Sequence, residues 1–285
     1  MLHGRHILVA AMLASVAGCD QMSSDFSDAS SSIFPPSPAE AGRWAVDDSD
    51  PENQRRGVLL LGNSSFGGDP VYINLYRLYI EENSDPVVKA TAIQALARHG
   101  QPEDAVLVAK QLDSPVEQIR IAAARALQRI HNPAIADQLW KKLIREDESA
   151  AVRVELAIAL GQYPTRDVFE ALAAALDDRE LSVNLAAADS LRLVTGADFG
   201  LESARWRAWL DATPTALRAD VPYYYPTFER TLGFGDYIIF WAIPTWEQPG
   251  LPAGMRTEAA PATTPAPAAA PAPATTEPPP ATPAK

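Results

Sequence analysis

The chain repeats itself every 31 to 33 residues over much of its middle. Four segments, residues 88–96, 119–127, 152–160 and 183–191, align so that each ends in leucine, and these leucines are 31, 33 and 31 residues apart. In each segment the apolar positions fall at i, i+4, i+7 and i+8, which is the spacing of one face of an α-helix. A fixed period of this size predicts a solenoid of helical repeats that bury their apolar faces against one another.

The residues between the repeats agree with this prediction. Several pairs combine a good N-cap residue with a proline at the first helical position, namely Asp50-Pro51, Asp69-Pro70, Asp85-Pro86, Ser114-Pro115 and Asn132-Pro133. We therefore expect about ten helices in antiparallel pairs, from about Glu52 to Leu210. Trp206 and Trp209, three residues apart, are expected to share one face of the last helix and to close the open end of the solenoid.

The repeated pattern Val-Arg-x-x-Ala-Ala-x-x-Leu resembles HEAT repeats, especially the short HEAT-like subtype. Lys89, Arg120 and Arg153 stand at the basic position of that family, and Asn184 departs from it in the last repeat. Asp147, six residues before Arg153, has the spacing of the acidic residue that links neighbouring repeats in the family. The resemblance implies an all-α solenoid, which we assign to residues 51–212, and it is nearly silent on function.

The N-terminus carries an apolar run that ends at a cysteine. Cys19 is the only cysteine, and it closes the string Val16-Ala17-Gly18-Cys19 after a run that is too short to span a bilayer. This string resembles the end of the signal sequence of bacterial lipoproteins. The resemblance implies that residues 1–18 are removed, that Cys19 carries lipid, and that the protein hangs from a membrane, facing the periplasm or the cell exterior. Residues 19–50 would then be a Ser/Pro-rich tether. An ordinary cleaved signal or an anchor helix with a stray cysteine is the alternative.

Two further segments follow the repeats. Residues 213–250 form an aromatic extension that includes Tyr223-Tyr224-Tyr225 and Phe240-Trp241, which suits packing back along the last helices, or a membrane interface or a partner. Residues 251–285 are rich in Ala, Pro and Thr and are expected to be a disordered tail.

Few residues of the sequence suggest catalysis or metal binding. His99 and His131 are 32 residues apart, and we expect them at the ends of equivalent helices, where a cation suits the helix dipole, rather than as metal ligands. We expect no metal, no cofactor and no catalytic residue. The formal net charge of −12 argues against nucleic acid as a partner.

The remaining hypothesis is a protein-binding groove. In HEAT repeats the Val-Arg helices line the concave side, which places Gln94, Arg98, Arg125 and Arg129 on one surface. That surface is either a binding groove or an ordinary solvated face whose arginines pair with acids of nearby turns. We expect a membrane-anchored, non-catalytic scaffold that binds a protein at the cell envelope. The alternatives are an enzyme similar to the bilin lyases, which share the short repeat, and a structural envelope protein that acts through its Pro-rich tail.

Overall fold

The computed structural model describes residues 37–213, 217–218, 221–227 and 249–255. Within these residues all regular elements are helical, apart from one isolated bridge between Ile130 and Ala253, and the predicted all-α fold is confirmed. The elements are α3 (Pro38–Ala45), α4 (Pro51–Asn63), α5 (Pro70–Glu82), α6 (Pro86–His99), α7 (Asp104–Lys110), η1 (Gln111–Asp113), α8 (Glu117–Ala126), η2 (Pro133–Ile135), α9 (Ala136–Leu143), α10 (Ala150–Leu160), α11 (Arg166–Ala175), α12 (Leu181–Thr195) and α13 (Ser203–Ala212).

The Asp-Pro pairs begin helices as the sequence predicts, whereas the predicted start at Ser114-Pro115 is wrong, because α8 begins at Glu117 with Val116 as its N-cap. The Asp50 carboxylate accepts hydrogen bonds from the amides of Glu52 and Asn53, and Asp85 does the same for Val87 and Val88. Each cap satisfies amides that the first turn of a helix leaves without an intrahelical partner. The starts of α4 and α6 are thus fixed by local sequence.

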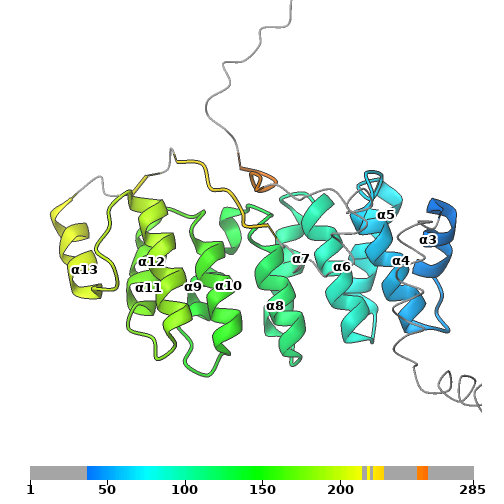
Figure 1. Cartoon of the computed structure of the whole chain (residues 1–285), viewed down its shortest axis with the longest axis horizontal. Helices are drawn as coiled ribbons and strands as arrows, with labels where there is room; N and C mark the ends of the chain where they lie inside the picture. Colours follow the sequence, from blue (N-terminus) through cyan, green and yellow to red (C-terminus); the bar gives the residue numbers. More distant parts are fainter. Residues whose placement is uncertain (1–36, 214–216, 219–220, 228–248, 256–285) are drawn as a thin grey trace, which may run out of the picture. The chain divides into compact units, whose positions relative to one another are not determined.

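The helices pack in two rows. Helices α4, α6, α8, α10 and α12 contact one another in turn and form a first row, which contains the four repeated Val-Arg segments (Figure 1). Helices α5, α7, α9, α11 and α13 form the second row, with η2 joining α7 to α9. Of these, α5, α7, α9 and α11 each pack against a helix of the first row. A continuous core of buried side chains from Ala41 to Leu210 lies between the rows.

Small side chains let neighbouring helices approach closely, and an aromatic cluster closes one end of the array. Gly62 of α4 lies so near α6 that a Cβ placed on it would be 2.7 Å from the Ala95 Cβ. At the far end Trp206 is fully buried and packs edge-on against Phe169 and Phe199, with ring centroids 6.3 Å and 5.0 Å away. The expectation that this tryptophan closes the end of the array is confirmed.

The boundaries differ from the expected ones at both ends. Residues 38–45, which we assigned to the tether, form α3, because Ser37 caps that helix and Ala41 and Ala45 are buried against the array. Residues 251–255, which we assigned to the tail, pack against the chain just after α8. Cys19, residues 228–248 and the chain from residue 256 lie outside the described residues. No helix in the described ranges has the length and apolarity needed to cross a bilayer.

Candidate binding surface

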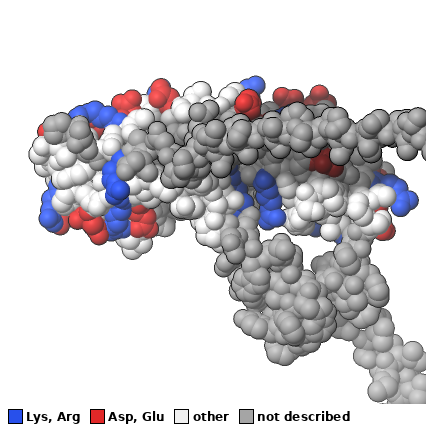
Figure 2. Space-filling view, turned by 90° about the horizontal axis from the view of Figure 1, so that it is seen from above, with Lys and Arg blue, Asp and Glu red and all other residues white. Residues whose placement is uncertain are grey.

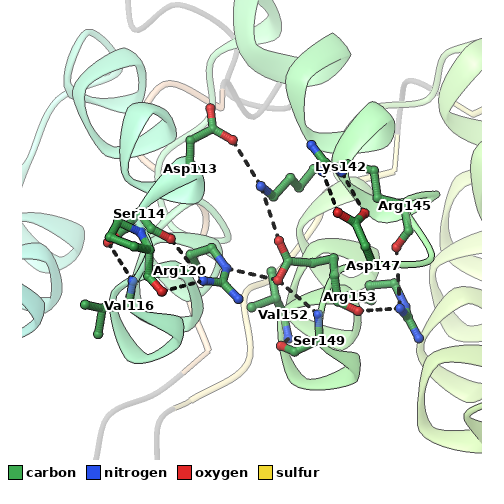
Figure 3. Close-up of polar contacts among 12 residues, drawn as sticks. Asp113, Ser114, Val116, Arg120, Lys142, Arg145, Asp147, Ser149, Val152 and Arg153 are labelled. Carbon is green, nitrogen blue, oxygen red and sulfur yellow. Dashed lines mark hydrogen bonds and ion pairs between the residues drawn. The ribbon is translucent and has the colours of Figure 1, made fainter.

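A polar network joins the turns of adjacent repeats (Figure 3). Arg120 of α8 forms an ion pair of 3.0 Å with Glu148, which precedes α10, and Lys142 contacts the same carboxylate at 3.2 Å. Burial alone would raise the pKa of Glu148, but hydrogen bonds from the Ser149 amide, Lys142 and Arg120 outweigh it and lower that pKa. Because Glu148 stays charged and is satisfied on several sides, it ties three elements together.

Arg153 plays the equivalent part in the next repeat. Its side chain is 2% exposed, pairs with Asp178 at 3.0 Å and donates to the Glu148 carbonyl. The prediction that Asp147 links the repeats through Arg153 is wrong, because Asp147 lies exposed in the turn and pairs with Arg145 at 2.6 Å. Arg153 instead pairs with Asp178, which follows α11. The six-residue spacing between Asp147 and Arg153 did not indicate this partner.

In the last repeat, Asn184 takes the place of the arginine. Its side-chain amide donates to the carbonyls of Ala175 and Asp178, at 2.9 Å and 3.0 Å. The short amide thus holds the same turn that Arg153 reaches from the other side. These buried groups fix the spacing of the repeats and are not exposed to a ligand.

The exposed candidates lie on what we call the outer face, the side of the first row that points away from the second row. Gln94 and Arg98 of α6 and Arg125 of α8 are exposed there. Arg125 pairs with Glu155 of α10 at 2.7 Å, and Gln128 donates to the same carboxylate at 2.8 Å. The structure therefore brings three of the four predicted residues to the surface of adjacent helices, and Glu155 balances the charge of Arg125.

Arg129, the fourth predicted residue, is only 3% exposed. Its guanidinium lies over the Tyr225 ring, 4.5 Å from the ring centre, and its carbonyl accepts a hydrogen bond of 2.8 Å from the Ala253 amide. The expectation that Arg129 projects from an accessible surface is wrong, because a segment far along the sequence covers it.

We call that segment the strap, residues 221–227 and 249–255, whose first part crosses the ends of α10 and α8 in yellow in Figure 1. The Tyr225 amide donates to the Gly250 carbonyl at 3.0 Å, and the His131 amide donates to the Ala253 carbonyl at 2.8 Å. Tyr223 is 3% exposed, and its burial raises the pKa of its hydroxyl. Gly254 has φ +90°, a conformation that favours glycine. Packing of the aromatic extension is confirmed for these residues, although it occurs at α8 and α10 rather than at the last helices.

The two histidines are not equivalent. His99 is the last residue of α6, and its Nε2 lies 2.8 Å from the Gly62 carbonyl oxygen. His131 lies beyond the end of α8, stacks on Tyr163 with ring centroids 4.9 Å apart, and has a pKa lowered by burial. The expected equivalence fails because the chain leaves the helix at Ala126. No group of three or more His, Cys, Asp or Glu residues suited to a metal occurs within the described ranges.

A second exposed feature lies at the N-terminal end of the array. An apolar groove of about 430 Å³ runs between α3, α4 and α5. Val46, Val71 and Leu78 line it and are 57%, 66% and 45% exposed. The described residues thus present both a charged outer face and an apolar groove. In the view of Figure 2, basic and acidic side chains are interspersed over the described residues.

Comparison with known proteins agrees with the repeat architecture. Residues 41–128 match the family of HEAT repeats, and residues 152–178 match the PBS lyase HEAT-like repeat. No curated protein matched the chain. Among solved structures, human deoxyhypusine hydroxylase in complex with glycerol is 24% identical over 55% of this chain and 62% of that chain, with a TM-score of 0.39. The chain thus spans less than two thirds of that enzyme's length. Residues 41–128 and 152–178 are thus similar to HEAT and HEAT-like repeats, in agreement with the helical array of the described residues.

Proposed function

We propose that this chain is a non-catalytic scaffold that binds a protein partner through its outer face and is held at a membrane of the cell envelope by lipid on Cys19. The observation that carries the proposal is the exposure of Gln94, Arg98 and Arg125 on two adjacent helices of a rigid repeat array. HEAT-like arrays present extended surfaces to partners, and the family matches support this use here.

Rigidity favours such a role. Arg120, Glu148 and Arg153 fix neighbouring repeats through buried ion pairs and backbone contacts. A surface that is already ordered before binding loses less conformational freedom when the partner arrives. Helices that pack side by side are about 8–10 Å apart, so Arg98 and Arg125 would meet carboxylates at comparable spacing on a partner.

The electrostatics favour an acidic peptide or helix as that partner. Arg125 shares its charge with Glu155, so a partner carboxylate at this point joins an existing ion pair rather than meeting an uncompensated charge. Most of the attraction would therefore act on encounter, as steering of the partner toward the strip.

The anchor rests on the lipobox-like string that ends at Cys19. At about 3.3–3.6 Å per residue, the 18 residues that follow Cys19, up to Ser37, could reach at most roughly 65 Å. The array would thus stay close to the membrane while keeping freedom to orient. If Cys19 is the anchor, the wild type takes up labelled fatty acid and stays in the membrane fraction after a salt wash, whereas Cys19→Ala does neither. Absence of label on the wild type would rule out this part of the proposal.

The scaffold role has a separate test. Intact cells are crosslinked, the chain is purified through a tag after Lys285, and the captured proteins are compared between the wild type and Arg98→Glu/Arg125→Glu. A specific partner is expected to be captured by the wild type and depleted in the double variant. Equal capture by both, with the variant folded, would contradict binding through the outer face.

A further inference from the structure

The apolar groove beside α3 and α4, the two blue helices of Figure 1, continues into an acidic hollow. Leu78 of α5 lines both parts, and the hollow has a volume of about 340 Å³. Asp48, Glu82 and Asp85 bring three carboxylates to the hollow, and no lysine or arginine of the described residues lines it. From Val71 to Glu82, α5 rises roughly 16 Å, so the combined groove spans about three helical turns and is apolar at one end and acidic at the other.

The apolar end is an exposed stripe on one face of a helix. Val71, Leu75 and Leu78 follow α5 at i, i+4 and i+7, and the buried Leu61 of α4 lies at the base of the groove. Val46, which follows α3, lines the other side. The outermost repeat of a solenoid usually carries a polar outer surface. Val46, Val71 and Leu78 depart from that rule together, and such a cluster of exposed apolar side chains marks a site of contact with another molecule.

The hydrogen bonds of the acidic end leave its negative charge in place. The Asp85 carboxylate accepts from two backbone amides at the start of α6, and Asp48 accepts from the Gln54 side-chain amide at 3.5 Å. Both sets of donors are neutral. Arg77, a basic residue of α5, pairs with Asp104 at 2.7 Å instead. This end of the groove therefore attracts a lysine or arginine of a partner.

Hydrogen bonds beside the hollow hold its walls together. The Tyr79 hydroxyl of α5 donates to the Ala45 carbonyl of α3 at 2.5 Å and accepts from the Gln54 side chain of α4 at 3.1 Å. The Asn83 side chain donates to Gln54 at 2.9 Å, and Gln54 is only 6% exposed. Because these contacts join three helices, the groove is formed before a ligand arrives and little ordering is needed on binding.

The form of the groove favours an amphipathic helix as its occupant. The apolar walls are half exposed, so the groove covers one face of whatever lies in it. A fatty acyl chain is apolar on every side and would keep much of its surface in water. A second copy of this chain needs an interface of about 800 Å² per partner, more than these few side chains offer. An amphipathic helix needs apolar cover on one face only, and it presents side chains at a matching i, i+4 and i+7 spacing.

We propose that this groove binds one amphipathic helix of a partner protein, whose apolar face lies on Val71, Leu75 and Leu78 and whose lysine or arginine side chains extend toward Asp48 and Glu82. The partner is thus basic at this point, whereas the outer face attracts acidic groups. The two surfaces differ in charge and in place, so this inference does not depend on the function proposed for the outer face.

A designed peptide tests the proposal on the full chain carrying Cys19→Ala. The probe is a fluorescent synthetic helix with leucines along one face and two lysines at one end of that face, and fluorescence anisotropy measures its binding. One saturable site is expected. A second peptide with glutamates in place of the lysines should bind at least about tenfold more weakly, because like charges then meet in the hollow. Equal binding of the two peptides, or no saturable binding of the lysine peptide, would overturn the proposal.

Matched variants locate the site. Leu78→Glu puts a charge into the apolar end and should weaken binding of the lysine peptide by about tenfold or more. Leu185→Glu changes a side chain of similar exposure on α12, 49% against 45%, and should have no effect. Asp48→Lys/Glu82→Lys should make the glutamate peptide the tighter ligand, a reversal that misfolding cannot produce. Equal effects of the two leucine variants, or no reversal in a folded chain, would contradict this site.

Two further measurements separate the groove from other surfaces. Arg98→Glu/Arg125→Glu should leave binding of the lysine peptide nearly unchanged, so a failure of the outer-face proposal and a failure of this one are distinguishable. Loss of peptide binding in that variant would place the peptide on the outer face and overturn the inference. Phosphatidylcholine vesicles test a membrane as the occupant. If vesicles bind in a manner that Leu78→Glu abolishes, and the lysine peptide does not bind, the groove contacts lipid and the proposal is wrong.

Discussion

The Arg129 guanidinium lies 4.5 Å from the centre of the Tyr225 ring and is shielded from solvent by the strap. Arg98 stands at the same position of the preceding repeat, two residues after the closing leucine, and is exposed. Equivalent arginines thus have opposite environments because the strap covers one repeat and leaves its neighbour open. The strap, together with the repeats, therefore determines which part of the outer face a partner can reach.

Removing the Tyr225 ring should loosen the strap. Tyr225→Ala is expected to speed hydrogen exchange of the His131 amide, which donates to Ala253, by about fivefold to tenfold, because a cation–π contact of this kind contributes about 1 kcal/mol. Tyr224→Ala is the control, since its ring is 54% exposed and should matter little. Equal protection of the His131 amide in both variants would show that the ring does not hold the strap.

The ion pair at Arg153 should matter far more than pairs at the surface. Arg153→Ala leaves Asp178 and several turn carbonyls without their donor and is expected to lower the free energy of unfolding by about 3–5 kcal/mol. Arg166→Ala, whose side chain is 62% exposed beside Glu170, should change it little. Denaturant unfolding of both variants measures this difference. A loss at Arg153 no larger than at Arg166 would mean that the buried link does not stabilise the array.

His131 should make stability depend on pH. Burial lowers its pKa in the folded protein, so the unfolded chain binds the proton more readily. The neutral ring favours the folded state above the ordinary pKa of 6.5, and this advantage is lost as the pH falls below it. The wild type should therefore lose more stability than His131→Asn between pH 8 and pH 5.5. Parallel pH profiles of the two proteins would contradict the assignment.

Local sequence explains most of the fold, and long-range contacts explain the rest. The spacing of the closing leucines and the caps at Asp50 and Asp85 predicted the helices, because both signals act within one or two turns. The partner of Arg153 and the burial of Arg129 depend on Asp178 and Tyr225, which belong to other parts of the chain. Helical periodicity carries no information about such pairs.

Charge reversal tests most directly whether the outer face binds a protein partner. Binding of the captured partner is measured at low and high salt for Arg98→Glu/Arg125→Glu and for Lys141→Glu/Arg166→Glu. The second pair reverses the same number of charges on α9 and α11, at side chains that are 59% and 62% exposed. We predict a loss of affinity of tenfold or more for the first pair only, and a larger loss at low salt, because high salt already screens the attraction. Equal effects of the two pairs, or no effect of either on folded protein, would contradict it.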